Sequence, residues 1–207
     1  MKEGKIKSLF LDIGGVILTN GWDHHARERA MQHFNLEKTE MEERHHLTFD
    51  TYESGKLTLD QYLDRLVFYE KRLFNKNDFK AFMFEQSQAF EDVITFFKTL
   101  KDKYHLKLVA VNNEGRELNE FRIKKFKLVT LFDAFVSSCY VHLRKPDAEL
   151  YDLACDISQT HVNHVLYIDD RNMFVEVALS LGMHAYHWQG LEAGMEYMKT
   201  EGLGIGD

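Results

Sequence analysis

The stretch SLFLDIGG, residues 8–15, decides the fold class of this chain. A short apolar run ends at Asp12, and two glycines then stop it. A continuous apolar run of this length before turn residues predicts a strand buried on both faces. Burying a carboxylate at its end is costly unless the group has a partner. We therefore interpret Asp12 as a functional residue rather than a turn cap.

Four later apolar runs have the same character; they lie at residues 106–111, 134–137, 165–168 and 184–188. Residues between them show helical spacing, as over 90–100 and over 175–181, where Gly182 marks a helix end. Strands and helices that alternate in this way predict an α/β fold with a doubly wound parallel sheet.

The segment between the first and second predicted strands offers only helical patterns. We expect four helices there, at residues 23–34, 36–47, 58–73 and 77–85. Thr58 is a suitable N-cap for the third of them. We predict that residues 1–20 and 89–207 form the core and that residues 21–88 form a helical cap. An insertion at this point lies over the carboxyl ends of the strands, where such folds bind ligands.

The composition of the 207 residues, 44% hydrophobic and 29% charged, is typical of a globular chain. The net charge of −7 provides no overall cationic field for nucleic acid or anionic lipid. No stretch reaches the roughly 20 apolar residues of a membrane helix. Two cysteines are too few for a disulfide scaffold and suit a reducing compartment. We expect a cytoplasmic protein that binds neither nucleic acid nor membrane.

Polar residues follow the predicted strands: Asp12, the pair Asn112–Asn113, Lys145 and the pair Asp169–Asp170. Because the carboxyl ends of parallel strands meet at one edge of a sheet, we expect these side chains to converge. Three carboxylates repel one another unless a cation lies between them, and oxygen ligands suit Mg²⁺, which also binds phosphate oxygens. A carboxylate here can act as a nucleophile, and a lysine adds positive charge for phosphate. Two structural alternatives stay open: an aspartate of the pair 169–170 could cap the next helix, and the asparagines could form a turn.

Taken in order, these stretches resemble the four motifs of the haloacid dehalogenase-like hydrolase superfamily, in its members with a helical cap inserted after the first motif. The matching segments are residues 10–17, 108–113, 143–147 and 167–170, the last followed by Ala178, Leu181 and Gly182. The first motif has the form D-x-G-x-V. Each motif alone is a weak signal, but the ordered set of four is specific. The resemblance covers essentially the whole chain and implies a central first strand.

The resemblance implies a role for each residue at the catalytic centre. Asp12 is the nucleophile, and Lys145 steadies both the nucleophile and the phosphoryl group. Asp170 binds Mg²⁺ directly, with Asp169 in support. Asp12 and the backbone carbonyl of Gly14 are the remaining protein ligands of the metal.

Three positions depart from the usual family pattern. The residue two after the nucleophile is usually a second aspartate, which protonates the leaving group and then activates water, but here it is Gly14. Asn112 replaces the usual threonine or serine; its amide and the backbone around Asn113 can still donate to phosphoryl oxygens. Phe174 stands where many relatives have asparagine. General acid–base catalysis contributes about 10²–10⁴-fold, so we expect a slow enzyme unless the substrate or another side chain supplies the proton.

The eleven histidines include two adjacent pairs, His24–His25 and His45–His46. Adjacent residues of a helix point about 100° apart, so neither pair chelates one ion from a single face, and we expect surface residues. Trp22, His24 and His25 follow the first motif closely, where cap residues can contact substrate. We name these three as candidates for substrate specificity.

The sequence therefore favours a magnesium-dependent phosphatase of small phosphorylated metabolites, sugar phosphates among them, that forms an aspartyl-phosphate intermediate. One alternative is a catalytically impaired relative that binds a phosphorylated ligand or a partner. Another is a 2-haloacid dehalogenase, which forms a similar ester on Asp12 without a metal. We expect a monomer or a homodimer.

Overall fold

Five parallel strands form one sheet in the computed structural model, which describes residues 6–205 of the chain. Their order across the sheet is β3-β2-β1-β4-β5. The strands are β1 (Ser8–Leu11), β2 (Lys107–Asn112), β3 (Ala134–Ser137), β4 (Val165–Asp169) and β5 (His184–His187). Strand β1 pairs with both β2 and β4 and is therefore central. The predicted α/β class and the doubly wound parallel sheet are confirmed.

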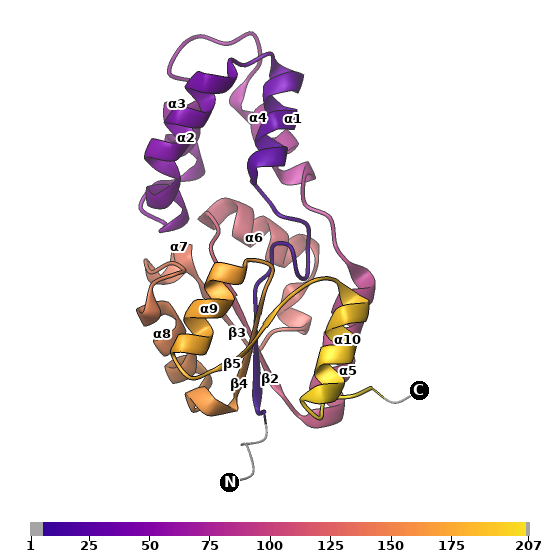
Figure 1. Cartoon of the computed structure of the whole chain (residues 1–207). Coiled ribbons are helices and arrows are strands. Elements are labelled where there is room, and N and C mark those ends of the chain that lie inside the picture. Colours follow the sequence, from indigo (N-terminus) through magenta and orange to yellow (C-terminus); the bar gives the residue numbers. More distant parts are fainter. Residues whose placement is uncertain (1–5, 206–207) are drawn as a thin grey trace.

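Helices cover both faces of this sheet (Figure 1). One face carries α5 (Glu91–Tyr104) and α10 (Leu191–Thr200), and the other carries α8 (Ala148–Ser158) and α9 (Asn172–Ser180). The remaining core helices are α6 (Arg116–Lys125), the short α7 (Ser138–Val141) and two 3₁₀ turns, Leu128–Thr130 and Val162–His164. Within residues 6–205, no helix combines the length and the apolar character that crossing a membrane requires.

The two faces of β1 explain why residues 9–11 of this strand are apolar. Leu9 and Leu11 pack against α5 and α10, whereas Phe10 packs against α8 and α9, and all three are fully buried. Successive side chains of a strand point to opposite faces, so a strand covered on both sides is predominantly apolar. Each side chain buried in this way contributes about 1.5–3 kcal/mol. The buried hydroxyl of Ser8, at the start of β1, lies 2.7 Å from that of Thr160. Asp12 follows this strand and is thereby fixed at the edge of the sheet.

Four helices between β1 and α5 have a hydrophobic core of their own. They are α1 (His24–Phe34), α2 (Lys38–Glu53), α3 (Leu59–Leu66) and α4 (Lys76–Glu85), and they lie beyond the carboxyl ends of the strands (Figure 1). Thr58 caps α3 as predicted, in a capping box with Gln61. The second helix is longer than predicted and the third shorter, since α2 continues to Glu53 and α3 ends at Leu66.

The two connections between this helical segment and the core run side by side. The amide of Thr19 donates to the carbonyl of Gln88 at 2.9 Å, and the amide of Phe90 donates to the carbonyl of Ile17 at 3.1 Å. Leu18 and Ala89 form an antiparallel bridge. We propose the domain boundaries at these connections, with residues 21–88 as the cap; residues 1–5 and 206–207 of the predicted core lie outside the described residues.

Candidate active site

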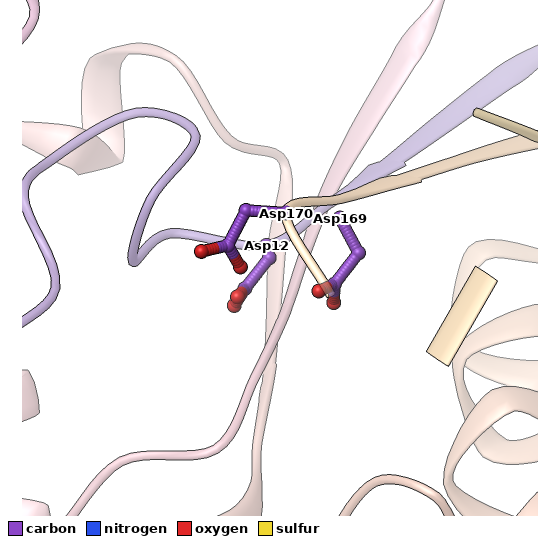
Figure 2. A group of neighbouring side chains, drawn as sticks. All are labelled: Asp12, Asp169 and Asp170. Carbon is purple, nitrogen blue, oxygen red and sulfur yellow. The ribbon is translucent and has the colours of Figure 1, made fainter. Parts of the chain in front are cut away.

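Three carboxylates converge where β1 and β4 end (Figure 2). Asp12 follows β1 directly, Asp169 is the last residue of β4, and Asp170 comes next. One carboxylate oxygen from each lies within 4.8 Å of the others. Because β1 and β4 are paired in parallel register, residues 157 positions apart along the chain meet at one point. The convergence predicted for these aspartates is what the structure contains.

A buried lysine lies between two of these carboxylates. The Nζ of Lys145 is 3.1 Å from Oδ1 of Asp12 and 2.6 Å from Oδ2 of Asp169, and the residue is only 1% exposed. Burial opposes the charged form, but the two carboxylates outweigh it and raise the pKa of the Lys145 ammonium. The ring of Phe174 lies 5.1 Å from this ammonium. Phe174, one of the three departures from the family pattern, therefore packs against Lys145.

The side chain of Asn113 fixes the backbone of Lys145. Its Nδ2 donates to the Lys145 carbonyl at 2.9 Å, and its Oδ1 accepts from the Lys145 amide at 2.9 Å. These bonds join the loop after β2 to the loop that carries the lysine. The Asn113 side chain is thus engaged with Lys145, and the proposed contact of Asn113 with phosphate is left to its backbone.

Asp169 is held from several sides and has no exposure to solvent. Its Oδ2 accepts from the Lys145 ammonium and from the hydroxyl of Tyr167, and its Oδ1 accepts from the amide of Arg171 at 2.8 Å. Every oxygen of this carboxylate therefore has a partner within the protein. Arg171 is the N-cap residue of α9 and no side chain caps that helix, so the alternative of a capping aspartate is wrong.

The other two carboxylates are less well compensated. Burial, with the negative charges of Asp169 and Asp170, raises the pKa of Asp12 to about 7 in spite of the neighbouring lysine. Burial and the charge of Asp169 also raise the pKa of Asp170. The Oδ1 of Asp170 is buried and has no hydrogen-bond partner within residues 6–205. A buried carboxylate oxygen without a donor, beside a second carboxylate, suits a hard divalent cation such as Mg²⁺.

Of the two glycines that follow Ile13, Gly15 allows the close approach of Asp170. Gly15 has a φ of +72°, and a Cβ at this position would lie 2.1 Å from Oδ2 of Asp170. Any side chain there would displace the carboxylate. Gly14 has no such backbone constraint, but a Cβ on it would lie 2.8 Å from Oδ1 of Asn20. Asn20 donates in turn from Nδ2 to Oδ2 of Asp170 at 3.3 Å.

Asn112 is the last residue of β2 and not part of a turn. Its Oδ1 accepts from the hydroxyl of Ser137 at 2.7 Å, and its Nδ2 donates to Oδ1 of Asn119 at 3.0 Å. An amide NH₂ carries two hydrogens, so one donor of Asn112 is left for a ligand. The residue borders the pocket over the carboxylates, which is compatible with the predicted phosphate contact.

The geometry above agrees with a comparison against known families. A family model described as haloacid dehalogenase-like hydrolase matches residues 12–187. The chain belongs to this family. The predicted superfamily is confirmed, and with it the general class of hydrolase.

Several solved structures of family members have the same fold. HAD family enzyme BT-2542 from Bacteroides thetaiotaomicron, in complex with magnesium and inorganic phosphate, has a TM-score of 0.74 at 19% identity over 89% of this chain and 94% of that chain. A predicted HAD-like family hydrolase from Porphyromonas gingivalis has a TM-score of 0.76 at 17% identity, covering 95% and 98%. An L-2-haloacid dehalogenase has a TM-score of 0.65 at 18% identity, covering 88% and 86%. At these identities the likeness establishes the fold alone.

One curated protein is similar over most of this chain. It is drimenol cyclase drtB of Aspergillus calidoustus, which is 28% identical over 186 residues. The match covers 87% of this chain but 33% of that protein. The chain therefore spans about a third of the length of this relative.

The helical segment and the core border a common pocket above the carboxylates. Core residues of the pocket include Asp12, Asn112, Lys145 and Phe174, and the cap contributes the aromatic residues Trp22, His45, Phe49 and Tyr52. Of the three candidates for specificity, Trp22 borders the pocket. Its Nε1 donates to the hydroxyl of Tyr62 at 3.0 Å, which orients the indole.

His24 and His25 do not border the pocket. Their side chains are 53% and 75% exposed, and both lie near the carboxylate of Glu28. Helix α1 buries the face that carries Ala26, Ala30 and their neighbours, so its first two residues point away. Both residues lie on the surface, as expected for this histidine pair, and a role for them in specificity stays a prediction.

His45 is a pocket residue that the sequence placed on the surface. Its Nδ1 is 2.7 Å from the Tyr62 hydroxyl, and its ring stacks on Phe49. Burial, followed by the charge of Arg27, lowers the pKa of His45 to about 4. The Tyr62 hydroxyl therefore joins the Trp22 indole and the His45 imidazole, and the lowered pKa keeps this imidazole neutral near pH 7.

Two further site residues, Asn20 and Tyr167, were not identified from the sequence, and neither was the contact of the Asn113 side chain with Lys145. Tyr167 could have been found, because it precedes Asp169 by two residues in the same strand and so points to the same face. Asn20 has no such local signal. Its partner Asp170 lies 150 residues further along the chain.

Proposed function

We propose that this protein is a magnesium-dependent phosphatase of small phosphorylated metabolites that forms a phosphate ester on Asp12. The observation that carries the proposal is the convergence of Asp12, Asp169 and Asp170 within 4.8 Å, together with a buried lysine that compensates only part of their charge. The magnesium and inorganic phosphate in the complex of BT-2542 support a phosphorylated substrate for a site on this fold.

Mg²⁺ fits the residues that are present. Asp12, Asp170 with its unpartnered Oδ1, and the carbonyl of Gly14 would hold it, while Asp169 is already occupied by Lys145 and Tyr167. When bound, the ion neutralises charge on phosphate oxygens and brings the substrate and Asp12 together despite their like charges.

The protein's own groups supply the remaining chemistry. Asp12 attacks phosphorus, and the amide of Ile13, which donates to Oδ1 of Asp12 at 2.8 Å, fixes the orientation of its carboxylate. Lys145 faces the phosphoryl group with a fixed positive charge. The free hydrogen of Asn112 and the backbone around Asn113 donate to phosphoryl oxygens. The cap borders the pocket with Trp22, His45, Phe49 and Tyr52 and would limit the access of water by closing over the substrate.

The proposal is tested with p-nitrophenyl phosphate and a panel of phosphorylated sugars, with Mg²⁺ and with EDTA. We expect turnover that requires Mg²⁺ and that Asp12→Asn abolishes, because the amide is a poor nucleophile. Asp152→Asn, at an exposed position of α8, is the matched control and should retain full activity. Turnover by Asp12→Asn at the rate of the original protein would refute the proposed nucleophile.

A second candidate function has an observation in its favour. Gly14 provides no acid, and Asn20 fills the adjacent space, as in a protein that binds a phosphorylated ligand or partner without turnover. Thermal stabilisation by such ligands without product would select this candidate. The dehalogenase alternative is disfavoured because the unpartnered oxygen of Asp170 serves no purpose in a reaction without metal; halide release that is insensitive to EDTA would revive it. The cytoplasmic location and the oligomeric state stay predictions from the sequence.

A further inference from the structure

Asn20 occupies the space in which an acid on residue 14 would stand. The Oδ1 of Asn20 lies 2.8 Å from the position of a Cβ on Gly14, and both residues border the pocket next to Asp12. The Asn20 amide also donates to Asp170. A carboxamide neither releases nor takes up a proton at neutral pH. The position beside the reacting phosphorus is therefore filled by a group that cannot perform acid–base catalysis.

Burial raises the pKa of the Tyr52 hydroxyl at the pocket far above its usual range, which makes this phenol a weak acid, although it has no hydrogen-bond partner within residues 6–205. The carboxyl groups that border the pocket beside Asp12 are engaged elsewhere. Asp23 caps α1 by accepting from the amide of Ala26. Glu53 and Glu114 accept from arginines at 2.5 Å, the first from Arg144 and the second from Arg122.

The imidazole of His45, also at the pocket, is neutral and bonded to Tyr62. Glu114 is the strongest rival as an acid, because burial raises its pKa even beside Arg122. Its carboxylate lies under the connection between cap and core, since a Cβ on Gly21 would lie 2.8 Å from Oε2 of Glu114.

We propose that the site selects phosphate esters and anhydrides whose leaving group departs without receiving a proton from the protein, such as aryl phosphates, acyl phosphates and diphosphates, rather than alkyl monophosphates. This inference rests on the proposed phosphatase function and narrows its substrate class. Simple sugar phosphates, whose leaving groups are alkoxides, become poor substrates. General acid catalysis contributes about 10²–10⁴-fold, and that factor is the discrimination we expect.

The two steps balance without an acid on the protein. In the first, an oxygen of Asp12 forms a bond to phosphorus while the bond from phosphorus to the leaving oxygen breaks. The leaving group takes the electron pair and, where it is basic enough, gains a proton from bulk water. In the second, a water oxygen attacks phosphorus, the bond to Asp12 breaks with its electron pair returning to the carboxylate, and the protons of the water go to orthophosphate and solvent. Without a base to activate that water, the phosphorylated Asp12 accumulates when the first step is fast.

The experiment measures kcat/KM for a series of phosphate monoesters, from nitrophenols through phenol to simple alkanols, with Mg²⁺ present. This parameter reports the first chemical step when the second is slow. For the original protein we expect a steep decrease as the leaving group becomes more basic. Acid quenching during turnover of p-nitrophenyl phosphate should trap a phosphorylated Asp12 peptide, detected by mass spectrometry.

The informative variant is the double substitution Gly14→Asp with Asn20→Ala. Gly14 does not have a positive φ, so its backbone accepts a side chain once Asn20 is shortened. The aspartate should reduce the dependence on the leaving group and raise kcat/KM for alkyl phosphates by about 10²–10⁴-fold. Asn20→Ala alone is the matched control, and its kcat/KM should still decrease steeply as the leaving group becomes more basic. Thermal stabilisation by Mg²⁺ with inorganic phosphate checks that the double variant keeps its site.

Three outcomes would overturn the inference. An original protein that hydrolyses alkyl and aryl phosphates equally well would already have an acid. If kcat/KM of the Glu114→Gln variant depends more steeply on the basicity of the leaving group, Glu114 is that acid. The double variant would show that residue 14 is not the acid–base position if it binds Mg²⁺ and phosphate but its kcat/KM still falls as steeply with leaving-group basicity as in the original protein. By contrast, no turnover of any ester would refute the phosphatase function itself.

Discussion

Replacing Lys145 by methionine tests whether the carboxylates at the strand ends depend on this ammonium. The substitution keeps the length of the side chain and removes the charge that lies 2.6 Å from Asp169 and 3.1 Å from Asp12. Asp169 has no exposure to solvent, so it cannot regain hydration. Removing one partner of a buried ion pair costs about 3–5 kcal/mol. We expect the free energy of unfolding to fall by that amount in urea titrations with EDTA present.

The loss should depend on pH in a defined direction. Without Lys145, the pKa of Asp12 rises further above about 7, so the folded variant binds protons that the unfolded chain does not. Stability of the variant then decreases as the pH rises. We expect a smaller loss at pH 6 than at pH 8, because protonation removes part of the uncompensated charge.

An exposed ion pair provides the matched control. The Nζ of Lys101 is 2.7 Å from Oδ1 of Asp133, with side chains that are 22% and 45% exposed. The geometry is similar but water solvates both partners, so Lys101→Met should cost at most about 1 kcal/mol. If Lys145→Met fails to fold, adding Asp169→Asn should recover stability by removing the buried charge. An equal and small loss for both lysine variants would refute the reasoning.

Three further predictions concern the cap and the metal site. Because the pKa of His45 is about 4 in the fold against 6.5 in the unfolded chain, the unfolded chain binds the proton more readily and stability falls as the pH falls through this window. The contribution is about 3 kcal/mol at 1.36 kcal/mol per pKa unit. His45→Gln should flatten the pH dependence of urea unfolding between pH 6.5 and 4, and an unchanged slope would contradict the burial of His45. Asp170→Asn should abolish the thermal stabilisation that Mg²⁺ gives, whereas Asp152→Asn should keep it; an undiminished shift in Asp170→Asn would exclude this ligand. Thr58→Ala removes the capping box of α3 and should cost about 1 kcal/mol in thermal unfolding, while no loss would show that Gln61 and water suffice at that helix end.

Short local sequence patterns were sufficient to predict the strands of the core. An apolar run that stops at a polar pair describes a strand buried on both faces, and this is a property of a few adjacent residues. Asp12 and the pair Asp169–Asp170 were found in this way, because the end of a parallel strand fixes both the residue and the edge of the sheet on which it lies.

The sequence was a poorer guide to which face of each cap helix is buried and to where the cap helices begin and end. His24 and His25 were named from their position along the chain, but the buried face of α1 turns both toward solvent. His45 was assigned to the surface because adjacent histidines of a helix cannot bind one ion from a single face, whereas its contact with Tyr62 depends on a neighbouring helix. Packing between helices decides such cases, and no single helix contains that information.

The sequence by itself determined the parallel sheet, the ordered motifs and the aspartates at the strand ends, because each depends on neighbours along the chain. Only the tertiary structure decided what fills the space beside Gly14 and what orients Lys145. Asn20 reaches Asp170 across 150 positions, and Asn113 reaches Lys145 across 32. Contacts at such separations form only when the loops that carry them have been positioned by the sheet, so the chemistry available to the site is set by packing rather than by local pattern.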